Sequence, residues 1–269
     1  MAADHGTREE ELEFVLTRRG ALGLAGLLAL AGATPSLAQT PVAAVQSPLP
    51  LTLMVVGDSL GDGVWGSLYW RFYSTREVRV INTAKASTGF NRTPYEESLD
   101  LPDGQTAQLA IVMTGANDAQ SVSPLQEGAA PGFFGTASWA QLYRQRMDRF
   151  FDAARTRGIT LIWIGLPIMR DAGFERRMAV VREAQREACA ARGVTFLDLV
   201  PASVDDSGAY AESKADDKGR VRTIRADDGV HLTVYGSERI AEIVLFTLLE
   251  LKPDWMDAGR ERLFRAALG

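Results

Sequence analysis

LTLMVVGDSLG, residues 51–61, joins an almost uninterrupted apolar run to a turn that contains a serine. The apolar part, residues 51–56, predicts a strand that is buried on both faces of a parallel sheet. Ser59 follows the predicted end of this strand. Because reactive groups in open α/β sheets gather at the carboxyl ends of strands, Ser59 stands where a nucleophile is useful. The alternative role for Ser59 is an N-capping serine at a strand-to-helix turn.

Two other motifs overlap this turn. Residues 57–61 match the G-x-S-x-G pattern of the α/β-hydrolase nucleophile elbow, and residues 61–66 match the G-x-G-x-x-G dinucleotide fingerprint. A dinucleotide site needs its first glycine close to the strand end and an acidic residue about 20 positions further on. Here Gly61 comes five residues after Val56, and the second predicted strand ends at Asn82. Both facts disfavour dinucleotide binding.

Short apolar runs alternate with amphipathic helical patterns along the rest of the chain. This alternation predicts an α/β fold, with a parallel sheet that is covered by helices on both faces. The predicted strands are residues 51–56, 78–82, 109–113, 159–165 and 194–197, and the predicted helices are residues 60–74, 139–157, 174–192 and 234–251.

Three segments fall outside this alternation. Residues 119–138 contain several prolines and glycines and predict a long loop beside the strand ends, which makes them a candidate substrate wall. Residues 200–226 are polar and predict an exposed excursion or a short hairpin. Residues 253–269 form an amphipathic tail that is too short to be a domain.

The first 38 residues have the features of an export signal. Arg18 and Arg19 are paired, residues 20–33 form a modestly apolar segment, and residues 36–38 offer small side chains for cleavage. The segment is too short to span a bilayer comfortably. It resembles a twin-arginine signal, which implies a periplasmic or secreted protein that folds before export. An uncleaved membrane anchor is the alternative.

This export prediction can be tested through the arginine pair. Replacing both arginines by lysine should leave the precursor in the cytoplasm, and undiminished export would remove the twin-arginine assignment. One feature departs from the usual basic pattern, because residues 9–13 include four glutamates. Either translation begins later than Met1 or the paired arginines suffice. Residues 39–50 follow as a Pro/Ala/Ser-rich linker without periodicity.

Length and charge limit the remaining function classes. Removing 38 of the 269 residues leaves 231, enough for one well-buried domain. The removed part holds five acidic and three basic side chains, so the formal net charge changes from −5 to −3. This balance gives no indication of a nucleic acid or an anionic membrane as partner. Cys189, the single cysteine, falls among alanines in a helical pattern and is interpreted as a small core residue.

His231 is the only histidine beyond the predicted signal, and it follows Asp228 by three positions in a turn that contains a glycine. A serine nucleophile needs a base, and the base needs a partner that fixes its tautomer. Asp228 can serve His231 in this way, and Asp227 is a possible substitute. One histidine and one distant cysteine cannot form a nitrogen or sulfur metal site. A carboxylate-only calcium site stays open for the acidic group Asp205, Asp206, Asp216 and Asp217.

Four short blocks occur in order and together resemble the SGNH, or GDSL, hydrolase family. They are residues 57–60, Gly89, residues 115–118 and residues 228–231, and the resemblance covers about residues 51–250. It implies a flavodoxin-like three-layer α/β/α fold with a five-stranded, mostly parallel sheet. It also disfavours the α/β-hydrolase fold, where the elbow normally lies in the middle of the chain.

Further matches favour a bacterial exported subgroup of this family whose substrates are poorly defined. They lie at residues 119–120, 165–170 and 228–233. On this basis residues 51–252 form the hydrolase domain, and residues 253–269 remain a tail.

The resemblance assigns roles to single residues. It implies that Ser59 is the nucleophile, His231 the base and later the acid, and Asp228 the residue that orients His231. It further implies an oxyanion hole made by the backbone N–H groups of Ser59 and Gly89 and the side-chain amide of Asn117. No cofactor is implied. A turn-forming role is the alternative for Asn117.

Other polar residues near the predicted strand ends receive supporting roles. Asp58 and Asp118 are expected to hold loops through hydrogen bonds to the backbone rather than to take part in chemistry. Arg92 and Arg170 are candidate contacts for an anionic group of a substrate, and a solvated side chain is the alternative for each.

These features together predict an exported serine esterase that cleaves oxygen esters through an acyl-enzyme. The predicted compartment favours an O-acyl group on a carbohydrate or a cell-envelope glycan as substrate. An O-acyltransferase that passes the acyl group to a sugar hydroxyl is a second hypothesis. A non-catalytic glycan-binding protein is a third, and the intact Ser-His-Asp set argues against it.

Overall fold

A five-stranded parallel sheet forms the centre of the structure, a computed structural model that describes residues 50–102 and 105–269. The strand order is β2-β1-β3-β4-β5, and all four pairings are parallel. The predicted α/β class is therefore confirmed, with a sheet that is parallel throughout. The predicted signal, and the predicted linker up to residue 49, lie outside the described residues. The strands are β1 Leu51–Gly57, β2 Val78–Asn82, β3 Leu109–Met113, β4 Thr160–Ile164 and β5 Thr195–Leu197.

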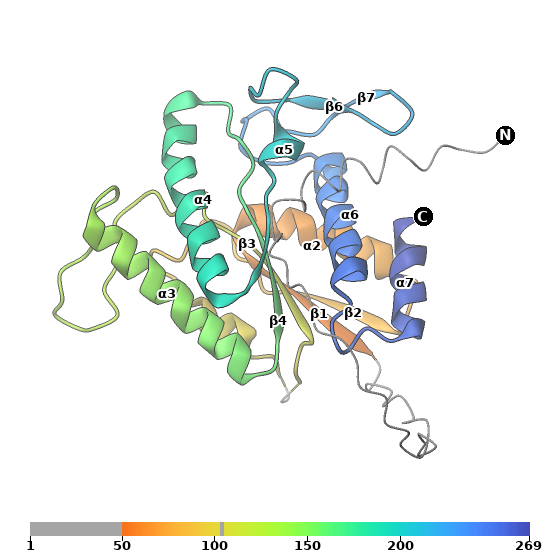
Figure 1. Ribbon diagram of the computed structural model, residues 1–269, viewed down its shortest axis with the longest axis horizontal. Coiled ribbons are helices and arrows are strands. Elements are labelled where there is room, and N and C mark those ends of the chain that lie inside the picture. The colour runs from red at the N-terminus through yellow and green to blue at the C-terminus, as the bar shows by residue number, and fades with distance from the viewer. Residues whose placement is uncertain (1–49, 103–104) are drawn as a thin grey trace, which may run out of the picture. The chain divides into compact units, whose positions relative to one another are not determined.

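Helices cover both faces of the sheet (Figure 1). On one face α2 (Ser59–Phe72) packs beside α6 (Val234–Leu251), and α6 contacts α7 (Ala258–Leu268). The other face carries α3 (Ala137–Thr156) and α4 (Ala172–Arg192), which contact each other. The result is the three-layer arrangement expected from the sequence. Each helix described here is too short or too polar to cross a membrane.

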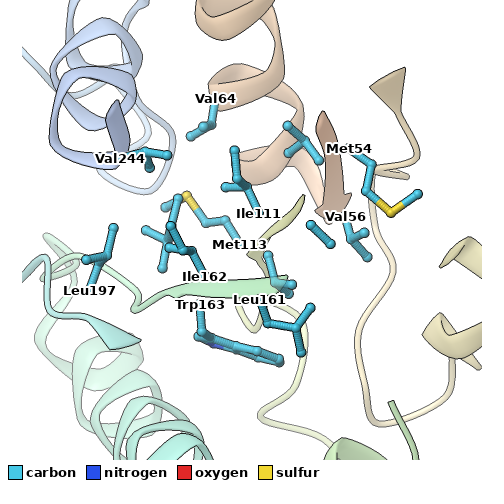
Figure 2. Close-up of a cluster of buried hydrophobic side chains, with 14 of the residues drawn as sticks. Met54, Val56, Val64, Ile111, Met113, Leu161, Ile162, Trp163, Leu197 and Val244 are labelled. Carbon is cyan, nitrogen blue, oxygen red and sulfur yellow. The ribbon is translucent and has the colours of Figure 1, made fainter. Parts of the chain in front are cut away.

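The core lies on both sides of the sheet. Every residue of β1 and β3 is buried, which explains why these strands are continuous apolar runs rather than alternating ones. Figure 2 shows Ile162 of β4 on the side of Val64 and Val244, which belong to α2 and α6, while Leu161 and Trp163 point to the opposite side. Burial of each such side chain contributes about 1.5–3 kcal/mol. This packing makes the strand ends a rigid platform.

The strand order places a topological switch between β1 and β3. The helix that follows β1 lies on one face of the sheet, and the helix that follows β3 lies on the other (Figure 1). Order 2-1-3-4-5 is that of flavodoxin-like folds, in which ligands bind in the crevice where the two connections diverge. Ser59 begins α2 on one side of this crevice, and residues 114–118 follow β3 on the other.

The polar segment at residues 200–226 contains more secondary structure than its sequence indicates. It contains α5 (Val200–Ser203) and an antiparallel hairpin of β6 (Ser213–Ala215) and β7 (Val221–Thr223), which confirms the hairpin. Ile224 and Arg225 at its end are buried. The prediction of an exposed excursion was therefore wrong at this end, because a buried arginine has the same local sequence signature as a solvated one.

The two other irregular segments, residues 119–138 and 253–269, are close to their predictions. The predicted loop at residues 119–138 is closed by a single bridge between Val122 and Gly132, and α3 begins two residues earlier than expected. A short 3-10 helix, η1 (Tyr95–Leu99), was not predicted. In the C-terminal tail, Phe264 of α7 is fully buried, so the amphipathic pattern of this segment reflects packing on the domain.

Candidate active site

Ser59 stands at the first position of α2. The preceding Asp58 caps the helix, and its carboxylate accepts a hydrogen bond from the Leu60 N–H at 2.9 Å. The N–H groups of a first helical turn have no helical carbonyl to donate to, and the helix dipole makes this end positive. The Ser59 N–H therefore belongs to a site suited to developing negative charge. The side-chain Oγ lies 2.8 Å from Nε2 of His231.

His231 is held by Asp228 in a tight turn before α6. Its Nδ1 lies 2.5 Å from Oδ2 of Asp228, and Oδ1 of the same carboxylate accepts from the backbone N–H groups of Val230 and His231. Partial burial raises the pKa of Asp228, but these hydrogen bonds outweigh it and lower the pKa to about 2. Asp228 is thus ionised at neutral pH and can stabilise an imidazolium. The carboxylate on the ring is that of Asp228 and not of Asp227.

The loops that carry Asn117 and Gly89 meet beside this chain of hydrogen bonds. Nδ2 of Asn117 donates to the carbonyl of Thr88 at 2.9 Å, which ties the loop after β3 to the loop after β2. A Cβ on Gly89 would lie 2.1 Å from Oδ1 of Asp118, so any larger residue would force the loop away. The Gly89 N–H makes only a long contact, 3.4 Å, with Oγ1 of Thr93.

Two buried carboxylates hold these loops together. Oδ2 of Asp58 accepts from the backbone N–H groups of Gly115 and Ala116 at 3.1 and 3.2 Å. Oδ1 of Asp118 accepts from the Asn91 N–H at 3.1 Å. Both side chains are fully buried. The loop-holding role predicted for Asp58 and Asp118 is confirmed by these contacts.

A buried polar network beneath the loops was not predicted from the sequence. Oγ1 of Thr88 lies 2.6 Å from the hydroxyl of Tyr95, which lies 3.1 Å from Oγ1 of Thr114. Nε2 of Gln185 donates to the Thr114 carbonyl and to the hydroxyl of Tyr143, each at 2.9 Å. These residues come from separate elements, so no local pattern could have revealed the network. Gln185 is fully buried in the middle of α4, but a buried glutamine in a helix has the same local sequence signature as an exposed one.

The sequence of this chain matches one known protein family. The family DUF459, described as a protein of unknown function, matches residues 52–247. The chain belongs to the DUF459 family. No curated protein sequence matches it.

Solved structures show which fold this DUF459 chain has. A Bacteroides fragilis protein, provisionally described as an acylhydrolase, aligns with a TM-score of 0.54 at 12% identity, over 77% of this chain and 92% of that one. A GDSL-like lipase from Bacteroides thetaiotaomicron gives 0.50 at 13% identity, over 75% and 88%. TesA gives 0.50 at 18% identity, over 74% and 99%. At these identities the likeness shows the fold alone, which is that of the SGNH hydrolases.

Arg92 and Arg170 are both exposed, and each lies on a loop at the carboxyl edge of the sheet. A guanidinium nitrogen of Arg92 lies 3.4 Å from Oε1 of Gln120 and so bridges two neighbouring loops. Arg170 donates its backbone N–H to Gly229 and its guanidinium to the carbonyl of Asp227. Arg170 thus packs on the histidine turn of the DUF459 chain, and its role as a substrate contact stays a prediction, as does that of Arg92.

The alternative sites considered from the sequence have other structural roles. Residues 61–66 lie within α2 rather than in a loop, so their backbone cannot cradle a pyrophosphate. Burial raises the pKa of the Cys189 thiol, which disfavours the thiolate. Asp205 and Asp216 accept hydrogen bonds from N–H groups of their own turns. Across residues 50–102 and 105–269, no three His, Cys, Asp or Glu side chains are grouped as metal ligands.

Asp118 should make the stability of the protein depend on pH. Burial raises its pKa from 3.8 to about 6, against the hydrogen bonds from Tyr143 and Asn91. Between these values the native state keeps a proton that the unfolded chain releases, so stability present at acidic pH is lost as the pH rises. The two-unit difference corresponds to roughly 3 kcal/mol.

Urea unfolding of the wild type and of Asp118→Asn, at pH 4 and pH 7, measures this effect. The wild type should lose about 2 kcal/mol more than the variant between the two pH values, because the amide does not titrate and part of the effect is already lost at pH 4. Burial also raises the pKa of Asp58, which both proteins keep. The charge of Asp58 is one cause of the raised pKa of Asp118, so the difference between the two proteins includes this coupling. Identical pH dependence of the two proteins would contradict the role of Asp118.

Proposed function

We propose that this protein is a serine esterase that hydrolyses oxygen esters through an acyl-enzyme. The observation that carries the proposal is the continuous chain from Ser59 through His231 to Asp228, with contacts of 2.8 and 2.5 Å. Nε2 of His231 accepts the serine proton while Oγ bonds to the carbonyl carbon. The tetrahedral intermediate then expels the alcohol, which takes the proton back from the imidazolium. Water repeats the two steps and releases the acid.

Three donors are proposed to stabilise the oxyanion that develops on the carbonyl oxygen. The Ser59 N–H lies at the positive end of α2, and the Gly89 N–H makes only one long contact. The Asn117 amide carries two N–H bonds, of which one is directed at Thr88. The second N–H is available to a ligand. Donors that are held in place before the reaction cost no reorganisation as charge develops.

The proposed substrate is an ester of a bulky alcohol, such as an O-acyl group on a carbohydrate or a cell-envelope glycan. The side chains of His231 and Asp228 are 44% and 49% exposed, so the acid-base end of the triad is open to a large leaving group. The predicted export signal supports the same choice. An exposed histidine also admits water, which favours hydrolysis over transfer to a sugar hydroxyl. Product analysis with and without a sugar acceptor would separate these two reactions.

A fluorophosphonate probe tests the proposed nucleophile without knowledge of the natural substrate. Ser59 should be the labelled residue when the modified peptide is mapped, because only a serine beside a base attacks phosphorus readily. Ser59→Ala should not be labelled. The matched control is Ser67→Ala, which changes a buried serine on the same helix and should be labelled like the wild type. Labelling of a different residue, or none in the wild type, would refute the proposed function.

A further inference from the structure

Arg225 is a fully buried arginine that follows β7. Its Nη1 donates to the carbonyl of Ile168 at 2.6 Å, and its Nη2 donates to the carbonyls of Val230 at 2.8 Å and Gly229 at 3.2 Å. Its Nε lies 3.4 Å from the carbonyl of His231. One guanidinium therefore joins the loop after β4 to three successive carbonyls of the turn that ends in His231.

The polar groups of this turn are divided between two side chains. The N–H groups of Val230 and His231 donate to the carboxylate of Asp228, while the Val230 carbonyl accepts from Arg225. The carbonyls of Gly229 and His231 accept both from Arg225 and from backbone N–H groups. A buried carbonyl without a donor destabilises the fold, so the guanidinium stabilises the turn in one conformation. Asp228 therefore fixes the conformation of the turn from the solvent side, and Arg225 fixes it from the core side.

The loop to which Arg225 ties the turn is itself fixed to α4. Nη1 of Arg182 donates to the carbonyl of Leu166 at 2.9 Å, and Oε2 of Glu175 accepts from the Met169 N–H at 2.8 Å. Both side chains belong to α4, which packs on the sheet. Arg225 thus connects the histidine turn, through the loop after β4, to a rigid element of the core.

On the outer side the turn is closed by Arg170. Gly229 has a φ of +70°, and a Cβ there would lie 2.4 Å from Cβ of Arg170. The turn therefore has little freedom to move outward. On the inner side Arg225 contacts all three carbonyls, and the Val230 carbonyl accepts from Arg225, while those of Gly229 and His231 also accept from the N–H groups of Arg170 and Ala226.

We propose that Arg225 is a positioning residue that keeps the His231 ring in reach of Ser59. The proposal rests on the proposed function, because Arg225 acts on the reaction only through His231. A planar fork with five donors can bind carbonyls of two separate segments at once. A lysine ammonium is a single point and cannot reach both the Ile168 and the Val230 carbonyls in the same geometry. A positive charge at position 225 is therefore not sufficient to hold the turn.

Kinetics of two variants and one matched control test this role. Arg225→Lys should lower kcat for an aryl ester about tenfold, and Arg225→Met about 10²-fold, because a displacement of about 1 Å at the reacting groups costs about that much. KM should change little, since Arg225 does not touch the substrate. The control is Arg260→Lys, another buried arginine, which donates to the carbonyl of Trp255 in the C-terminal region. Its kcat should equal that of the wild type.

A spectroscopic readout works even if the wild type hydrolyses no ester. The chain has only two histidines, His5 and His231, so ¹⁵N-histidine labelling gives a simple spectrum that a His5→Asn variant assigns. The wild type should show an Nδ1–H signal from the His231–Asp228 hydrogen bond. The signal should broaden or vanish in Arg225→Lys and persist in Arg260→Lys. An unchanged signal in Arg225→Lys would overturn the proposal, whether or not the protein is an esterase.

Hydrogen exchange of the wild type decides the question if neither Arg225 variant folds. The amides of Val230, His231 and Met169 should then exchange with one common opening free energy, because Arg225, together with the backbone N–H of Arg170, ties the turn to the loop after β4. Rapid exchange of the turn beside a protected Met169 would overturn the proposal. A wild type that shows the Nδ1–H signal but hydrolyses no ester would count against the esterase function alone.

Discussion

Alanine at Ser59 or at His231 should abolish turnover of a short-chain aryl ester, with kcat falling by about 10⁶ while the protein stays folded. Without Oγ no acyl-enzyme can form, and without the imidazole the serine proton has no acceptor. The fold should survive because Oγ of Ser59 is hydrogen-bonded to His231, while the cap of α2 is supplied by Asp58. Initial rates beside thermal melts measure both parts of the prediction.

The double variant separates a cooperating unit from two independent residues. If Ser59 and His231 act on one proton transfer, Ser59→Ala/His231→Ala should be hardly slower than either single variant. Losses that multiply would mean that the two residues act separately.

Asn117→Ala should lower kcat by on the order of 10² to 10³, about 3–4 kcal/mol, with little change in KM. An amide that donates to the developing oxyanion binds the transition state more strongly than the ground state, so its loss appears in kcat. The structure adds a second, smaller effect. Because the same amide donates to the Thr88 carbonyl, the variant should also lose about 1 kcal/mol of stability. Kinetics and melts of the purified variant measure the two effects.

Asn117→Asp distinguishes the oxyanion role from a role in shaping the turn. A carboxylate would face both the Thr88 carbonyl and the developing negative charge, so this variant should be at least as slow as Asn117→Ala. If Asn117 only formed the turn, aspartate would preserve most of the activity, because it is also a turn former. An active Asn117→Asp enzyme would therefore exclude the oxyanion role.

Local patterns were sufficient for the elements and for the neighbours within a turn. The limits of α6, Val234–Leu251, agree with the sequence prediction because Thr233 caps the helix and an apolar stripe runs through it. Asp228 and His231 are three residues apart, so their pairing is a property of one turn. The parallel sheet follows from alternation of strands and helices, since parallel strands need a crossover.

For residues that are distant in the chain, the sequence predicted which ones cooperate but not the distance between them. Ser59 and His231 are 172 residues apart and meet because β1 and the turn before α6 end at the same edge of the sheet. The family resemblance predicted that they cooperate. Only the packed sheet gives the 2.8 Å contact, since its geometry depends on how every layer of the core is filled.

The fold class and the order of the blocks were predictable from short-range patterns, and the candidate triad followed from the family resemblance of those blocks. The tertiary structure alone decided which buried polar groups hold that triad in place. Gln185 reaches the loop after β3 across 71 residues, and Arg225 reaches the loop after β4 across 57. A buried glutamine or arginine has no local pattern that distinguishes it from an exposed one, because its partners are backbone carbonyls that only tertiary packing brings within reach.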